Sequence, residues 1–210
     1  LIRSTDEPTS EALQNILIQA QQLNPKFLKE ETGYRIETRL TFPRNWGLGS
    51  SSTLINNIAN WANVDAQELL KRTFGGSGYD IACAQTNHPI LYQITNDKRS
   101  FEIAIEKLPF SDQIYFVFLN KKKNSREAIS AYRERDFNQK KLITRISQLT
   151  RQMAASSTLQ QFEDLIVAHE SLLSNTLGIA TVQSELFSDY SGAVKSLGGW
   201  GGAFVLATGN

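Results

Sequence analysis

One stretch decides how the rest of the sequence is interpreted: Pro43-Arg44-Asn45-Trp46-Gly47-Leu48-Gly49-Ser50-Ser51-Ser52-Thr53. It joins an alternating segment, predicted as a half-buried strand over 34–42, to a helix predicted from Ser50 to about Trp61. Glycines let such a loop curl so that successive N–H groups point inward, and the helix adds free N–H groups and its positive dipole end. The pattern predicts a phosphate-binding loop, with four hydroxyls that can bind phosphate or Mg²⁺. The alternative is a serine-capped helix after a turn, for which one hydroxyl suffices.

Other nucleotide-binding loops do not fit this stretch. No Gly-Lys-Ser/Thr ends it, so it is not a Walker A loop, and Ser52 stands where a dinucleotide-binding loop needs its third glycine. The His-Arg-Asp and Asp-Phe-Gly triplets of protein kinases do not occur in the sequence.

Two further glycine clusters stand out, since nine of the 13 glycines fall into three groups. In Gly75-Gly76-Ser77-Gly78-Tyr79-Asp80-Ile81-Ala82, Asp80 lies where a glycine turn meets a helix predicted over 80–84. It is either an N-cap or a carboxylate aimed at a ligand, and the sequence leaves both open. The third cluster, Gly198-Gly199-Trp200-Gly201-Gly202, joins two predicted strands and has more glycines than a hairpin needs, which favours close approach to a ligand or another loop.

These motifs resemble the GHMP kinases, the superfamily of galactokinase, homoserine kinase, mevalonate kinase and phosphomevalonate kinase. Pro43 to Ser52 resembles their phosphate loop, 76–82 their second motif, and 195–202 their C-terminal glycine motif, in the family's order. The string Gly-Tyr-Asp-Ile-Ala resembles a bacterial subgroup, the GYDIA-family GHMP kinases, which is grouped near the mevalonate-pathway enzymes. Two features depart from the family: its lysine-containing N-terminal strand is missing, and Ala203-Phe204 replaces a polar residue. We expect residues before Leu1 to supply that strand, and the chain to be part of a longer protein.

The resemblance implies specific roles. ATP and Mg²⁺ are the expected cofactors, with Gly47, Leu48, Gly49, Ser50, Ser51 and Ser52 around the ATP phosphates. Ser50 is the expected Mg²⁺ contact, and Asp80 the catalytic residue that accepts the hydroxyl proton or orients the acceptor. Glu68 is a second metal candidate, although the family position can also fall on Leu69, and a solvated helix glutamate is the alternative. Gly198, Gly199, Gly201 and Gly202 form the C-terminal motif, and Ser77, Lys123 and Ser125 are substrate candidates, with a solvated turn as the alternative for the lysine.

The resemblance also implies an α+β fold with two lobes. An N-terminal lobe like ribosomal protein S5 domain 2 is expected over 1–100, lacking its start, and a ferredoxin-like lobe over 101–210, with the break between Leu91 and Ile114. Apolar spacing is consistent with α+β. The same spacing predicts six further helices, over 8–23 (capped by Thr5 or Ser10), from Asp65 to the glycines at 75, and over 125–135, 138–153, 159–175 and 181–190. It predicts five further strands, over 90–94, 101–105, 114–119, 193–197 and 204–207.

Composition excludes several classes of function. A net charge of +1 argues against general attraction to nucleic acid or membranes, and no apolar run approaches the roughly 18 residues of a spanning helix. Cys83 is the only cysteine and is expected in packed core, which fits a cytoplasmic protein. His169-Glu170 lacks the second histidine of a zinc motif, because Leu173 takes its place, and is expected at or near a helix surface.

The expected function is phosphoryl transfer from ATP to a hydroxyl or phosphate of a small metabolite, with mevalonate and phosphomevalonate among the acceptors. The expected state is a monomer or homodimer without nucleic acid. Two alternatives stay open: an ATP-dependent decarboxylase of the diphosphomevalonate type, which would release CO₂, and a non-catalytic nucleotide-binding protein, which would not need Asp80.

Overall fold

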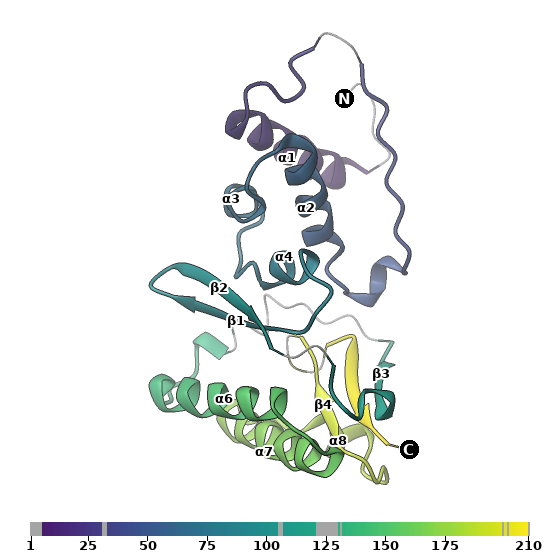
Figure 1. The fold of residues 1–210 in the computed structure, drawn as a ribbon, viewed down its shortest axis with the longest axis vertical. Helices are drawn as coiled ribbons and strands as arrows, with labels where there is room; N and C mark the ends of the chain where they lie inside the picture. Colours follow the sequence, from purple (N-terminus) through teal and green to yellow (C-terminus); the bar gives the residue numbers. More distant parts are fainter. Residues whose placement is uncertain are drawn as a thin grey trace. The chain divides into compact units, whose positions relative to one another are not determined.

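The computed structural model describes residues 6–30, 33–104, 107–120, 130, 132–198, 200 and 202–209 (Figure 1). The chain divides into two compact units. The first contains Leu1–Thr41 and Leu48–Ile103, and the second contains Phe42–Gly47 and Ala104–Asn210. The chain therefore crosses from one unit to the other three times. One crossing lies just before the predicted phosphate loop, between Thr41 and Phe42, and one lies within it, between Gly47 and Leu48.

The described part of the first unit consists of four helices and a β-hairpin. Its helices are α1 (Glu7–Leu23), α2 (Ser50–Ala62), α3 (Ala66–Arg72) and α4 (Tyr79–Ala84), and its strands are β1 (Ile90–Thr95) and β2 (Lys98–Ile103). The helices share one apolar core, in which Ile16 of α1, Ile55 of α2 and Ile81 of α4 are fully buried. The hairpin is antiparallel and turns at Asn96 and Asp97, both with positive φ, as two-residue hairpin turns require.

Local sequence signals account for these helices. Helix α1 was predicted over 8–23 and is confirmed, but its cap is Asp6, whose carboxylate accepts from the Thr9 N–H at 3.2 Å, while Ser10 lies inside the helix. Asp65 caps α3 as expected, accepting from the Glu68 N–H at 2.7 Å. Helix α2 begins at Ser50, where the sequence placed it, with Gly49 as its N-cap.

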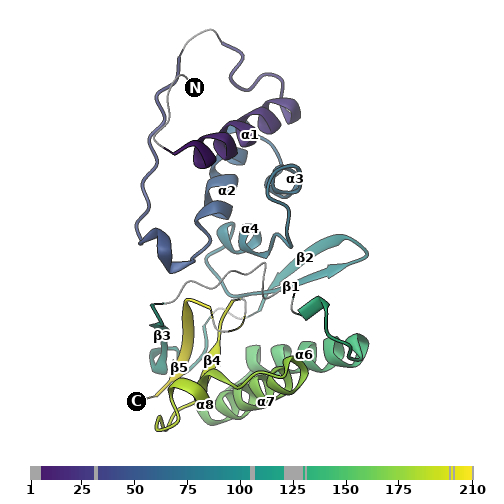
Figure 2. The same ribbon diagram turned by 180° about the vertical axis from the view of Figure 1, so that it is seen from behind.

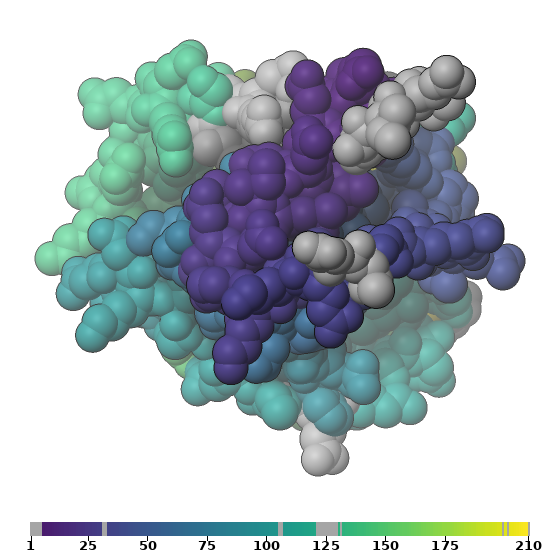
Figure 3. Space-filling view, turned by 90° about the horizontal axis from the view of Figure 1, so that it is seen from above, coloured from purple at the N-terminus to yellow at the C-terminus, as the bar shows by residue number. Residues whose placement is uncertain are grey.

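The predicted strand over 34–42 is wrong. Residues 33–40 pair with no described strand, and Tyr34 and Ile36 are each about half exposed. Space-filling Figure 3 shows this dark blue segment as an arm apart from the purple α1. An alternating pattern indicates that one face can be buried, but a strand forms only where another strand supplies its hydrogen bonds, and the described chain offers none here.

The second unit packs helices on an antiparallel sheet. It contains η1 (Arg44–Trp46), η2 (Ser111–Gln113), β3 (Ile114–Phe118), α6 (Gln139–Ala154), α7 (Leu159–Leu177), α8 (Val182–Leu186), β4 (Val194–Ser196) and β5 (Phe204–Thr208). The strand order is β3-β5-β4. Helices α6 and α7 lie along one face, where Leu206 joins their apolar cluster, and Val182 of α8 packs on the other (Figure 2).

The α+β class is confirmed, since all paired strands among the described residues are antiparallel and helices do not alternate with them. Most predicted elements of this unit are found close to their expected bounds, but α8 ends at Leu186 and is shorter than the predicted 181–190. The helix predicted over 125–135 lies mostly outside the described residues. None of the described helices combines the length and apolar character needed to cross a membrane.

Candidate functional site

The predicted phosphate loop leads into an uncapped helix N-terminus. Gly47 (φ 70°) and Gly49 (φ 74°) are both left-handed, a conformation that glycine adopts without strain. Gly49 is the N-cap of α2, and no described side chain caps this end of the helix. The Gly49 carbonyl accepts from the Thr53 N–H and hydroxyl, at 2.9 and 3.1 Å. The N–H groups of 50–52 therefore have no partner further back in the helix, which is the arrangement that binds anions elsewhere.

The first half of the loop is anchored within the second unit. Trp46 packs against Phe118 and Phe204, with ring centroids 5.8 and 5.5 Å away. A Cβ on Gly47 would lie 3.6 Å from the Ala203 Cβ. Trp46 and Gly47 are thus held, within the second unit, by the ends of β3 and β5 and by Ala203.

Asp80 is not an N-cap. Gly78 (φ 81°) occupies that position of α4, and Asp80 is the second residue of the helix and makes no capping bond. Its side chain lies instead beside the start of α2, because a Cβ on Gly49 would be 3.9 Å from both Cβ and Cγ of Asp80. The structure therefore brings together, within the first unit, the N-terminus of α2 and the carboxylate that the sequence singled out.

The surroundings of Asp80 favour its protonated form more than water does. Burial raises the pKa of the Asp80 carboxyl, and a hydrogen bond with the neighbouring Tyr79 side chain offsets part of the rise. Burial and the nearby carboxylate together raise the pKa of Tyr79 to about 12. A carboxylate with a raised pKa holds a proton better, which suits a general base.

Three side chains hold the carbonyls of the glycine turn that precedes Asp80. Arg99 of β2 donates from Nε to the Ser77 oxygen at 2.8 Å and from Nη2 to the Gly76 oxygen at 3.1 Å. The Tyr92 hydroxyl of β1 donates to the same Ser77 oxygen at 2.6 Å, and Gln67 Nε2 of α3 donates to the Gly78 oxygen at 2.9 Å. None of these three residues was predicted from the sequence.

The structure places the metal candidates Glu68 and Ser50 in different surroundings. Glu68 forms a 2.7 Å ion pair with Arg72 one turn along α3, and its hydrogen bond to Arg72 lowers the pKa of the carboxyl. Leu69 is fully buried in the core and has no group that binds a metal. Ser50 is the first residue of α2, at the free helix end. Within the described ranges, no group of three or more His, Cys, Asp or Glu side chains is placed so that it could hold a metal ion.

The first two residues of the C-terminal motif, Lys195 and Ser196, belong to a buried ionic cluster. Glu170 of α7 accepts from the Ser196 N–H at 3.1 Å and from Lys195 Nζ at 3.4 Å, and His169 Nδ1 lies 3.7 Å from the same carboxylate. His169 is buried, contrary to the expected surface position, because α7 packs on the sheet. Gly198 has a φ of 64° and Gly202 is buried, whereas Gly199 and Gly201 lie outside the described residues.

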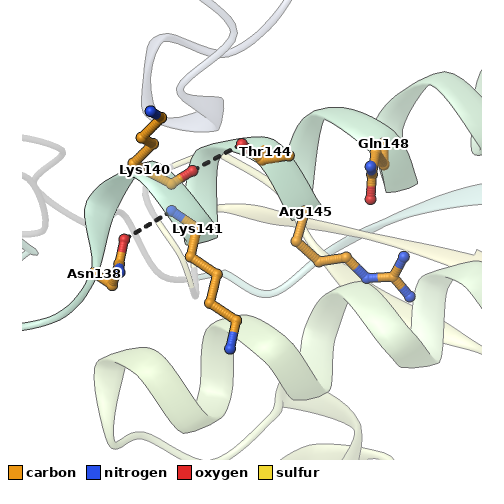
Figure 4. Close-up of a pocket in the computed structure, with 6 residues that line it drawn as sticks. All are labelled: Asn138, Lys140, Lys141, Thr144, Arg145 and Gln148. Atoms are coloured by element: carbon orange, nitrogen blue, oxygen red, sulfur yellow. Dashed lines mark hydrogen bonds between the residues drawn. The ribbon is translucent and has the colours of Figure 1, made fainter.

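Of the substrate candidates, Ser77 is exposed and contributes its carbonyl to the turn, whereas Lys123 and Ser125 lie outside the described residues. A hollow along the first half of α6 is lined by none of the predicted residues (Figure 4). Its lining includes Lys140, Lys141 and Arg145, and the side chains of Lys141 and Arg145 extend to the same side. Cys83 is exposed, so the expectation of a packed thiol is wrong.

Comparison with known proteins adds no relative. No protein-family model matches this sequence, and no curated protein matches it. The resemblance to the GHMP kinases thus depends on the three motifs.

Proposed function

We propose that this protein is a small-molecule kinase of the GHMP type. It transfers the γ-phosphoryl group of ATP to a hydroxyl or phosphate of a small metabolite, in the presence of Mg²⁺. The two units then correspond to an N-terminal lobe like ribosomal protein S5 domain 2 and a ferredoxin-like C-terminal lobe.

One observation carries the proposal: the Asp80 side chain lies against Gly49, at the free N-terminus of α2. The helix end offers N–H donors for phosphate, and the carboxylate next to it can accept the proton of an attacking hydroxyl. A binding protein would gain nothing from this carboxylate, because a negative charge beside bound phosphates repels them. A kinase explains why Asp80 lies at this position, because the acceptor hydroxyl has to lose its proton close to the phosphate that the hydroxyl attacks.

Each residue then has a distinct task. The N–H groups of 50–52 hold the phosphates, while Asp80 orients the acceptor hydroxyl and takes its proton at Oδ. The Ser50 hydroxyl would be the protein contact of a bound Mg²⁺, which would neutralise part of the phosphate charge. Phosphoryl transfer depends largely on positioning and on stabilised charge, so a pre-formed loop of this kind can contribute much of the rate.

The test is ATP binding by Gly49→Val, with Gly33→Val as the matched control. Both changes are identical, but a Cβ at Gly33 meets nothing within 4 Å, whereas Gly49 combines positive φ with the Asp80 contact. We expect Gly49→Val to lose ATP binding with the helical circular dichroism retained, and Gly33→Val to bind like the unchanged protein. Equal affinity in both folded variants would refute the phosphate site.

The acceptor is found by screening ATP consumption against mevalonate, phosphomevalonate, homoserine and sugars. A phosphorylated product without CO₂ supports the kinase. Release of CO₂ would identify a decarboxylase instead, and ATP binding without turnover of any acceptor would favour the non-catalytic alternative.

A further inference from the structure

The glycine turn before Asp80 cannot fix its own conformation. Gly75, Gly76 and Gly78 all have positive φ, and glycine is the residue with the greatest backbone freedom. Helix α4 has only six residues, and no described side chain caps its N-terminus. A helix this short is not stable alone, so the direction of Asp80 has to be set by contacts from elsewhere.

Those contacts come largely from the hairpin. Tyr92 and Arg99 lie on the same face of it, because Arg99 is the partner of Ile94, two residues from Tyr92. Both donate to the Ser77 oxygen, and Arg99 also reaches the Gly76 oxygen, so one guanidinium bridges two successive carbonyls. A planar guanidinium has its donors in fixed geometry, and a bridge of this kind restricts the peptide between the two carbonyls. The hairpin itself stands beside the helices of its unit (Figure 1).

We propose that Arg99 and Tyr92 are positioning residues for Asp80. They hold the Gly76 and Ser77 carbonyls and thereby set where α4 begins and where the Asp80 carboxylate lies relative to Gly49. Neither residue needs to touch ATP or the acceptor. The inference rests on the proposed function in one respect, namely that Asp80 acts on the acceptor.

The variant that tests this is Arg99→Met, and Lys98→Met is its matched control. Lys98 is the preceding residue on β2, exposed and paired across the hairpin with Thr95, so the control removes the same charge from the same strand without touching the turn. Because misplacement of a catalytic group by about 1 Å can cost 10²-fold, we expect Arg99→Met to lower kcat roughly 10²-fold with little change in the KM for ATP. Lys98→Met should keep kcat, and Arg99→Lys, which restores the charge and one donor, should recover part of it.

A second readout does not need activity. Cys83 lies one turn after Asp80 on the exposed side of α4, and burial together with the Asp80 charge raises the pKa of its thiol. The pH dependence of its alkylation by iodoacetamide, followed in the peptide that carries it, therefore reports the position of α4. We expect the midpoint to shift to lower pH in Arg99→Met and, by a smaller amount, in Tyr92→Phe, and to stay unchanged in Lys98→Met.

The outcomes separate the two claims. If Arg99→Met lowers only the melting temperature while kcat and the Cys83 midpoint stay unchanged, Arg99 is merely structural and the inference is wrong. If the Cys83 midpoint moves but the unchanged protein neither binds ATP nor consumes it, the turn is positioned as described and the proposed function fails. If Arg99→Met does not fold, Tyr92→Phe decides the question, because it removes a single hydroxyl.

Discussion

Replacement of Gly78 by alanine tests how tightly the turn before Asp80 is built. Gly78 has a φ of 81°, and a Cβ added there would lie 2.0 Å from Gln67 Oε1 and 2.9 Å from Gln67 Cδ. The Gln67 amide also donates to the Gly78 carbonyl at 2.9 Å. The change therefore brings two costs: a left-handed backbone at a residue that has a Cβ, and displacement of the Gln67 amide.

The structure sets the size of each cost. The left-handed conformation costs about 1–2 kcal/mol for a residue with a Cβ. The end of the glutamine side chain can swing away, so the clash itself is relieved cheaply, but its hydrogen bond is lost at about 1 kcal/mol. We expect Gly78→Ala to lower the free energy of unfolding by about 2–3 kcal/mol.

Urea unfolding of five variants, namely Gly78→Ala, Gly76→Ala, Gly33→Ala, Gln67→Ala and the double variant Gln67→Ala/Gly78→Ala, separates the two contributions. Gly76→Ala meets no atom within 4 Å at a φ of 99°, so it carries only the backbone cost, and Gly33→Ala carries neither. In a Gln67→Ala background, Gly78→Ala should cost about 1 kcal/mol less than it does alone, because the displaced amide is already absent. The reasoning would be refuted if Gly78→Ala were no more destabilising than Gly33→Ala, or if the Gln67→Ala background left its cost unchanged.

Three further predictions follow from other parts of the structure. Glu170→Gln should destabilise the protein by about 3 kcal/mol at neutral pH, measured by urea unfolding. The reason is that Lys195, whose side chain is only 19% exposed, loses its buried partner. Burial raises the pKa of the Glu170 carboxyl, but His169, Lys195 and the Ser196 N–H outweigh it and hold the pKa below its ordinary value of 4.5. The stabilisation is therefore present above about pH 4.5 and lost as pH falls further, so the variant should show a shallower loss of stability in acid; an unchanged acid profile would contradict this. Asp80→Asn should shift the alkylation midpoint of Cys83 to lower pH, because it removes a charge that raises the pKa of the thiol, and an upward shift would count against the arrangement of α4. Trp46→Ala should cost about 2 kcal/mol in the unfolding free energy through lost contacts with Phe118 and Phe204, and an unchanged unfolding free energy would contradict this packing.

Helices were predictable because their signals are local. Caps such as Asp65 and the apolar spacing of α1, α6 and α7 lie within each segment, and the observed bounds follow them closely. The alternation over 34–42 carried the same kind of signal for a strand, but pairing depends on a partner distant in sequence. Cys83 was misplaced because four residues, 81–84, are too few to define a helix face.

The candidate phosphate loop and Asp80 could be predicted from the sequence, but the residues that hold the turn before Asp80 could not. Glycine clusters and Asp80 stand out in the sequence, whereas the contacts of Tyr92 and Arg99 with the turn span 15 and 22 residues and depend on the register of the hairpin. The one available signal was the Asn96-Asp97 turn, which fixes that register and puts both side chains on one face. The cap role left open for Asp80 was excluded only by the position of Gly78 at the start of α4.

The most direct test of the proposed kinase is Asp80→Asn, in which ATP affinity and turnover of the screened acceptor are measured on the same preparation. The substitution keeps the size of the side chain and removes its charge and its capacity to accept a proton, and no cap is lost. We predict that turnover falls roughly 10²-fold or more while ATP affinity stays nearly intact. Turnover within about threefold of the unchanged protein would contradict the account, because general-base catalysis of this kind contributes at least 10²-fold.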